Sequence, residues 1–95
     1  MFSGIIEKTA RVLAIESDGS NRHFTLENPF GNEVYIDQSI AHNGTCLTLV
    51  AIDRDNKHYT VTAVKETLDK TNLGSWQTGT LVNIERCIRA DARMD

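Results

Sequence analysis

Short runs in which apolar and polar residues alternate make up most of this chain, and turn-forming residues separate them. Alternation with a period of two is typical of half-buried β-strands. The runs that predict strands are residues 1–16, 22–27, 34–36, 39–49 (two strands joined by a tight turn), 58–64 and 81–88. In the first run the alternation slips partway along, which indicates a bulge or a sharp bend. The only predicted helix covers residues 65–72, and Leu73-Gly74 follows it as a stop signal.

The chain is organised around residues 39–49, where Asn43-Gly44 separates two of these strands. Both residues of this dipeptide tolerate positive φ, so it favours a two-residue type I′ turn and a tight antiparallel hairpin. The pairs expected outward from the turn are His42 with Thr45, Ala41 with Cys46, Ile40 with Leu47 and Ser39 with Thr48.

The two faces of this predicted hairpin differ in the size of their side chains. One face carries Ile40, His42, Thr45 and Leu47, and the other carries Ser39, Ala41, Cys46 and Thr48. The second face is small throughout and mostly polar, whereas a core needs volume and an ordinary surface takes long charged side chains. A wall of a ligand pocket fits this face. The alternative is a thinly covered barrel seam with a buried cysteine.

The number and spacing of these elements indicate the fold class. Five or six short strands, with turn signals between them and one short helix, predict an all-β protein. We expect a six-stranded antiparallel Greek-key barrel with one short helix, formed by residues 1–88. The length of 95 residues allows a single domain with a modest core.

Composition and charge exclude several classes of function. With 40% hydrophobic and 24% charged residues and a net charge of −3, the chain predicts an ordinary globular protein without a nucleic-acid or membrane partner. It opens without a charged leader or a long apolar run, so we expect a cytoplasmic protein. Cys46 and Cys87 are then expected to be reduced thiols. These cysteines and His23, His42 and His58 lack the spacing of metal ligands, so no metal site is expected.

Four stretches of the chain, in the same order and at the same spacing, resemble riboflavin synthase and specifically its N-terminal half. They are residues 1–7, residues 39–49, residues 65–68 with 71–74, and residues 82–86. The resemblance runs from the first residue to about Arg86. It implies a six-stranded antiparallel barrel that binds 6,7-dimethyl-8-ribityllumazine or riboflavin, and this fold agrees with the strand pattern.

The resemblance also implies the reaction of the full-length family member. Two molecules of 6,7-dimethyl-8-ribityllumazine dismutate, one giving a four-carbon unit to the other, to yield riboflavin and a ribitylaminopyrimidine. The family uses no cofactor and no metal. Orientation of the two substrates is therefore the main task, and it is worth up to about 7–11 kcal/mol in favourable cases. The catalytic residues stay unknown, because no residue here is marked out as the proton acceptor.

Substrate-binding residues follow from the same resemblance. They are Gly4, Ile5 and Ile6 near the start, Ser39, Cys46, Leu47 and Thr48 in the hairpin, and Thr62, Ala63, Val64, Lys65, Glu66 and Thr67 further on. Hydroxyl groups suit the ribityl chain, and strand backbone groups suit the pyrimidinedione edge. Leu47 lies on the opposite face of the hairpin, so we expect its main chain to contribute. Phe2 and Ser3 are expected either to close over a ligand, from a neighbouring subunit, or to anchor the first strand.

Structural interpretations of the same residues stay open. Ser39 and Thr48 fit a cross-strand hydroxyl pair that stabilises the hairpin. Lys65 and Glu66 fit solvated charges at the start of a helix. Cys46 fits a small buried hydrophobe. We expect His42, beside the turn, to be an exposed strand residue rather than a base.

The length of the chain departs from the family pattern. Family members carry two copies of the barrel, with the active site between copies from different subunits, and this chain has one. We therefore expect an excised N-terminal domain that binds one substrate with little or no turnover. Residues 89–95 would begin the connection to an absent second barrel. Apolar surface that a twin would cover predicts a homodimer.

Three other functions compete with this interpretation. A non-catalytic lumazine or flavin antenna protein domain has the same barrel. A bare interaction barrel would bind no such ligand. An FAD-binding barrel is disfavoured because its Arg-x-Tyr-Ser/Thr motif is absent from the sequence.

Overall fold

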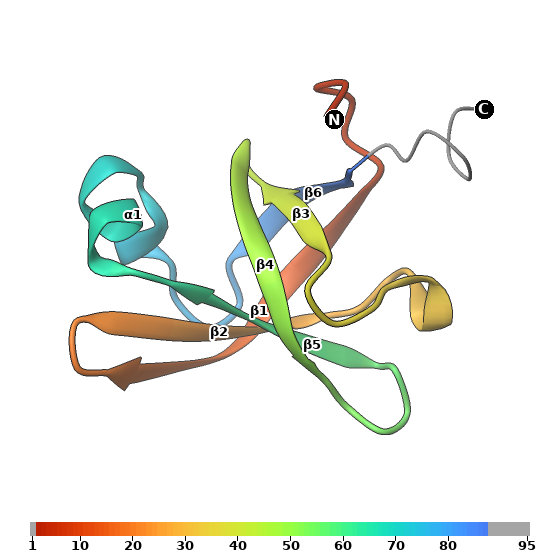
Figure 1. Ribbon diagram of the computed structural model, residues 1–95, viewed down its shortest axis with the longest axis horizontal. Helices are drawn as coiled ribbons and strands as arrows, with labels where there is room; N and C mark the ends of the chain where they lie inside the picture. Colours follow the sequence, from red (N-terminus) through yellow and green to blue (C-terminus); the bar gives the residue numbers. More distant parts are fainter. Residues whose placement is uncertain (1, 88–95) are drawn as a thin grey trace.

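Six antiparallel strands close into a barrel in the computed structural model, which describes residues 2–87 (Figure 1). The strands are β1 (Lys8–Asp18), β2 (Asn21–Glu27), β3 (Ser39–His42), β4 (Thr45–Ile52), β5 (His58–Ala63) and β6 (Leu81–Arg86). Their order around the barrel is β1-β2-β5-β4-β3-β6, and β6 pairs with β1 to complete the circle. The predicted six-stranded antiparallel barrel is therefore confirmed.

One short α-helix and two 3-10 turns complete the described part of the chain. The helix α1 (Lys65–Lys70) follows β5 directly, as predicted, and the turns are η1 (Gly31–Glu33) and η2 (Leu73–Ser75). None of the helices within residues 2–87 is both long and apolar enough to cross a bilayer.

Alternate residues of each strand fill the inside of the barrel, as the period-two pattern predicts. The apolar strand residues with at most 1% exposure are Ala10, Val12, Phe24, Leu26, Ile40, Leu49, Tyr59, Val61, Ala63, Val82 and Ile84. Trp76, which follows η2, packs edge-on against Phe24 with ring centroids 5.0 Å apart. Burying each large apolar side chain contributes about 1.5–3 kcal/mol. The interior is thus a packed core, and a ligand site has to lie on the outer wall.

Two bulges bend the strands enough to close the barrel. The register of β1 shifts between Val12 and Ala14, and that of β4 shifts between Leu49 and Ala51. A bulge adds a residue to one strand and increases its local twist. The shift in β1 confirms the irregularity that the alternation of residues 1–16 predicted, whereas the shift in β4 carries no signal in the sequence.

Several predicted elements or their boundaries are wrong. The first strand begins at Lys8, because Gly4 adopts φ +84° and residues 3–4 bond to Glu85 instead of continuing a strand. Residues 34–36 form no strand; they follow η1 as a loop in which Ile36 is 47% exposed. The helix ends at Lys70 rather than at residue 72. The last strand ends at Arg86, and Ile88, also predicted for it, lies outside the described residues, as do residues 89–95.

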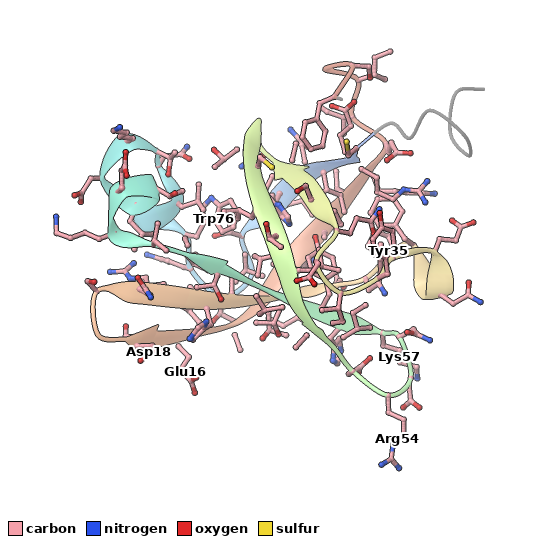
Figure 2. All side chains as sticks on the ribbon, in the orientation of Figure 1. Glu16, Asp18, Tyr35, Arg54, Lys57 and Trp76 are labelled. Atoms are coloured by element: carbon pink, nitrogen blue, oxygen red, sulfur yellow. The ribbon has the colours of Figure 1, made fainter. Side chains whose placement is uncertain are left out.

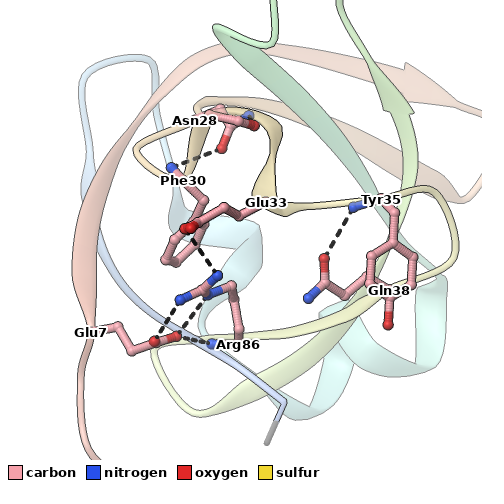
Figure 3. A network of polar contacts seen from close by, with 8 residues as sticks. Glu7, Asn28, Phe30, Glu33, Tyr35, Gln38 and Arg86 are labelled. Carbon is pink, nitrogen blue, oxygen red and sulfur yellow. Dashed lines mark hydrogen bonds and ion pairs between the residues drawn. The ribbon is translucent and has the colours of Figure 1, made fainter. Parts of the chain in front are cut away.

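Arg86 ties the end of β6 to two other parts of the chain (Figure 3). Its guanidinium Nη2 lies 3.0 Å from a carboxylate oxygen of Glu7, and Nη1 lies 3.4 Å from one of Glu33. The same group lies 4.3 Å from the ring centroid of Phe30, an attractive cation–π geometry. With its side chain only 15% exposed, Arg86 holds both η1 and the residues before β1 against the barrel.

Candidate functional site

The hairpin at residues 39–48 forms with the predicted register. Its pairs are Ser39 with Thr48, Ile40 with Leu47, Ala41 with Cys46 and His42 with Thr45. Asn43 and Gly44 adopt φ of 49° and 86°, as a type I′ turn requires. The turn is also fastened to β6, because the Asn43 N–H donates to the carbonyl of Asn83 at 2.7 Å.

The small face of this hairpin lies on the outside of the barrel. Ile40 and Leu47 point inward and are 0% and 4% exposed, whereas Cys46 and Thr48 are exposed and Ser39 is half-buried. The interpretation of Cys46 as a small buried hydrophobe is therefore wrong. The side chain of Leu47 belongs to the core, which leaves only its main chain for the outer face.

His42 is a core residue, and its predicted exposure is wrong. It is fully buried, with Nδ1 2.9 Å from the Ile40 carbonyl oxygen and Nε2 2.8 Å from the Tyr59 hydroxyl oxygen. Desolvation lowers the pKa of His42 to about 4, although the backbone hydrogen bond to Ile40 opposes this. Tyr59 reaches it from β5, across the barrel. A neutral imidazole bonded at both nitrogens in the core is a structural group rather than an accessible base.

The residues before β1 lie across β6, beside the hairpin. The backbone N–H groups of Ser3 and Gly4 donate to the carboxylate of Glu85 at 2.6 and 3.0 Å, and the Ser3 hydroxyl donates to it at 2.6 Å. Glu85 pairs with Ala41 on β3, and Ala41 pairs with Cys46 on β4. The first residues of the chain and the small face of the hairpin are thereby brought together.

A surface hollow of about 410 Å³ occupies the space between these segments. It is lined by Gly4, Ile6, Ala41, Asn43, Gly44, Asn83, Ile84 and Glu85. Figure 1 shows the segment before β1 near the end of the barrel where β3 and β6 meet. Two of the predicted site residues, Gly4 and Ile6, line this hollow, while Ile5 is 71% exposed.

The remaining predicted residues lie on the other side of β4, at the end of β5 and in α1. Ala63 is fully buried, Val64 is 48% exposed, and Thr62 and Thr67 are half-buried. Lys65 and Glu66 form exposed ion pairs one helical turn along, with Asp69 at 2.6 Å and Lys70 at 2.7 Å. Exposed pairs of this kind contribute a few tenths of a kcal/mol to the helix.

Strands β4 and β5 separate between these two groups of residues. Their last pair toward α1 is Leu49 with Val61, and beyond it the two strands diverge (Figure 1). If the register continued, Thr48 would lie opposite Thr62. The divergence instead leaves residues 46–48 and 62–64 outside the β4–β5 ladder.

Two residues near the site, Glu85 and His23, were not predicted to contribute to it. The alternation along its strand predicts only that Glu85 points outward. Nothing in the neighbouring sequence indicates its contact with Ser3, 82 positions away. His23 Nδ1 lies 2.7 Å from the hydroxyl oxygen of Thr62, and its Nε2 lies 3.2 Å from Asp18. Only the pairing of β2 with β5, which sets His23 opposite Thr62, reveals this chain of hydrogen bonds.

These features define the class of this protein: a closed antiparallel barrel with a filled interior and a shallow, mainly polar binding face on its outer wall. The face offers hydroxyls and a thiol beside strand segments that leave the β4–β5 ladder, and the carboxylate of Glu85 is occupied by residues 3–4. Such groups hydrogen-bond a small neutral ligand.

Comparison with known proteins identifies the family. A model of the lumazine binding domain matches residues 3–87. The riboflavin synthase of Escherichia coli (strain K12) is 36% identical over 91 residues, which cover 94% of this chain and 42% of that protein. The riboflavin synthase of Bacillus amyloliquefaciens is 36% identical over 94 residues, 98% of this chain and 43% of that protein. The riboflavin synthase of Saccharomyces cerevisiae is 35% identical over 101 residues, with coverages of 98% and 42%.

This chain therefore belongs to the lumazine binding domain family. It spans less than half the length of the curated relatives it matches.

Proposed function

We propose that this barrel binds 6,7-dimethyl-8-ribityllumazine or riboflavin on the outer face formed by Ser39, Cys46 and Thr48. The observation that carries the proposal is the row of short side chains on this face. Two of them are exposed on a barrel whose interior has no room for a ligand. Short side chains let a flat ring approach the strands closely, where backbone groups become reachable.

The two ends of such a ligand find suitable partners on either side of β4. Hydroxyls of Ser39, Thr48, Thr62 and Thr67 suit the ribityl chain, and the strand edges left by the divergence of β4 and β5 suit the pyrimidinedione. Thr62 already shares its hydroxyl with His23, so it acts as a donor or an acceptor according to the tautomer of that ring. Ile6, 55% exposed, supplies apolar surface for the ring system.

Turnover requires a second barrel in this proposal. Dismutation needs two lumazines held face to face, and one outer face holds one of them. We therefore propose that this chain corresponds to the first barrel, residues 1–88, of a riboflavin synthase, a transferase. Alone it binds ligand with little or no turnover and without a cofactor or metal. The relatives' greater length supports this arrangement.

A fluorescence titration with riboflavin tests the binding site. Ser39→Ala and Thr48→Val each remove one hydroxyl, and a neutral hydrogen bond contributes about 0.5–1.5 kcal/mol. Each variant should therefore weaken binding by roughly threefold to tenfold. Ser20→Ala and Thr78→Val make the same chemical changes at exposed positions in turns outside the hairpin and should leave the affinity unchanged. Equal affinities in all five proteins would exclude the small face as the site.

The main alternative is a non-catalytic lumazine or flavin antenna domain. It shares every feature of the binding face, so binding alone does not separate the two functions. The two functions are separated by mixing this chain with the C-terminal barrel of a riboflavin synthase and assaying riboflavin formation. Formation of riboflavin by the mixture, and by neither half alone, supports the synthase. Binding without any turnover in the mixture favours the antenna function.

Self-association and location belong to the same proposal. Apolar side chains at Ile5, Ile6 and Leu81 are 71%, 55% and 52% exposed, and surface of this kind marks protein contacts when it is contiguous. We propose that the isolated barrel forms a homodimer that covers part of it. Cys46 is an exposed thiol, which fits the reducing, cytoplasmic location that we propose.

A further inference from the structure

Glu85 is the one buried acidic residue among residues 2–87, and its carboxylate accepts hydrogen bonds from backbone amides. It is 7% exposed and accepts three hydrogen bonds, from the Ser3 and Gly4 N–H groups and from the Ser3 hydroxyl. We call this set of contacts the Glu85 clasp. It joins residues 82 positions apart, and it holds the chain ahead of the point where β1 begins.

The clasp fixes how the first residues of the chain cross the outer wall. Glu7 is held by Arg86 and by its own N–H, which donates to the Ile84 carbonyl at 3.0 Å. Between Glu7 and the clasp, Ile5 and Ile6 keep exposed side chains. The segment is therefore attached to β6 at two points. Glu7 is the point nearer to β1, and the contact of residues 3–4 with Glu85 is the point farther from it.

The attached segment forms one side of the hollow beside the hairpin. Gly4 and Ile6 line it from the segment, and Ala41 lines it from the small face. Ala41 is only 7% exposed even though its partner in the hairpin, Cys46, is exposed. The clasp holds Gly4 at this hollow, and Ile6 is also held through its neighbour Glu7, whose N–H donates to the Ile84 carbonyl.

Three donors around one carboxyl favour its ionised form. A carboxylate accepts at both oxygens, whereas the amide of glutamine has one accepting oxygen and turns an NH₂ group toward the N–H donors. The hydroxyl of Ser3, and then the two N–H groups, lower the pKa of Glu85, against its partial desolvation and the charge of Glu7. Hydrogen bonds to a charged acceptor are also shorter and stronger than neutral ones.

We propose that Glu85 is a positioning residue for the binding face: it holds Ser3 and Gly4 so that Ile6 and Phe2 border the ligand bound at the hairpin. The proposal rests on the function proposed above. It assigns no direct ligand contact to Glu85, whose carboxylate is fully used by residues 3–4. Residues 2–4 are then a wall of the site, attached by the carboxylate of Glu85 on β6.

Four proteins test the clasp in a double-mutant cycle: the unsubstituted chain, Glu85→Gln, a variant lacking residues 2–4, and the combination of both changes. Riboflavin is the ligand, and fluorescence gives the dissociation constant. A lost interaction with a charged group corresponds to about a tenfold change or more. Glu85→Gln and the truncation should each weaken binding by about tenfold. The combination should be no weaker than the truncation alone, since both remove the same wall.

Amide hydrogen exchange, followed by NMR, reports on the clasp without any ligand. The Ser3 and Gly4 amides should exchange slowly in the unsubstituted chain and at least about tenfold faster in Glu85→Gln. Asp55→Asn removes the same charge in the exposed turn between β4 and β5, at the far end of the molecule, and should change neither measurement. Figure 2 shows that turn, with Arg54 and Lys57 labelled, well away from the first residues.

Different failures have different meanings in this design. Additive losses in the cycle would overturn the proposal, because Glu85 would then act on the ligand by itself. Faster exchange with unchanged affinity would also overturn it, since the clasp would exist without serving the site. If the unsubstituted chain binds no riboflavin, the proposed function fails, and exchange alone decides whether Glu85 holds residues 3–4.

Discussion

Buried His42 couples the stability of this barrel to pH. Its imidazole lies between the Ile40 carbonyl and the Tyr59 hydroxyl, with the ring of Trp76 6.4 Å away, and none of these groups carries a charge that would favour a proton. The folded barrel therefore binds a proton on His42 less readily than the unfolded chain does. Protons shift the equilibrium toward the unfolded chain.

The pH dependence should appear between the two pKa values of His42, 6.5 when unfolded and about 4 when folded. Above pH 6.5 both states are neutral and the contribution is constant. As the pH falls from 7 to 5, the folded state should lose about 2 kcal/mol through this group. Urea unfolding at the two pH values measures the loss. His42→Gln should have a smaller pH dependence by about that amount, and equal dependences in the two proteins would contradict the assignment.

The environment of His42 also shows what alternation along a strand leaves out. The pattern correctly set His42 on the same face as Ile40 and Leu47, the face that proves to be the inner one. Its position beside a surface turn nevertheless indicated exposure. Burial of the imidazole depends on its hydrogen bond to Tyr59. Tyr59 lies 17 residues away, on a strand that does not pair with β3. No local pattern contains that contact.

Among the elements, the hairpin is the one that the sequence determines most completely. A two-residue turn leaves one register, so Asn43-Gly44 was enough to pair every residue from Ser39 to Thr48 correctly. The N-terminal segment is the opposite case. Its apolar residues suggested a strand, but a distant carboxylate and a glycine at φ +84° set its path.

Gly44→Ala should destabilise the barrel by about 1–2 kcal/mol, because an L-residue with a side chain is strained in the left-handed region. Gly44 has φ +86° and no atom within 4 Å of an added Cβ, so the cost comes from the backbone and not from a clash. Gly74→Ala is the matched control. An added Cβ at Gly74 would also meet open space, but Gly74 lacks a positive φ. Gly74→Ala should therefore change the stability of the barrel little. Equal losses in urea unfolding would contradict this explanation.

For the candidate site, the sequence indicated the components but not their assembly. The small face could be predicted because it depends on alternation within one hairpin. The separation of β4 from β5 beyond Leu49 and Val61, which exposes strand edges beside that face, depends on a bulge and on the direction of α1. The roles of Glu85 and His23 depend on pairings between strands far apart in sequence.

At the scale of the whole molecule, we expect the isolated chain to sediment as a dimer. Its exposed apolar residues include Leu13 and Leu81, which lie on the paired strands β1 and β6. Sedimentation at tens of micromolar should give a mass near twice 10.6 kDa. Leu81→Ser should shift the mass toward that of the monomer, while Arg54→Ser, in the exposed β4–β5 turn, should not. A monomeric mass throughout the concentration range would contradict the dimer.

Closure of the barrel by β1 and β6 also affects how a gene that encodes this fold can be duplicated. The segment leading into β1 runs beside β6, as the contact of Glu7 with Ile84 shows, so the chain enters and leaves the barrel at neighbouring places. Each barrel is closed by its own pairing of β1 with β6. Tandem duplication of such a gene therefore yields two complete barrels joined by a short connector, without any strand having to change partners.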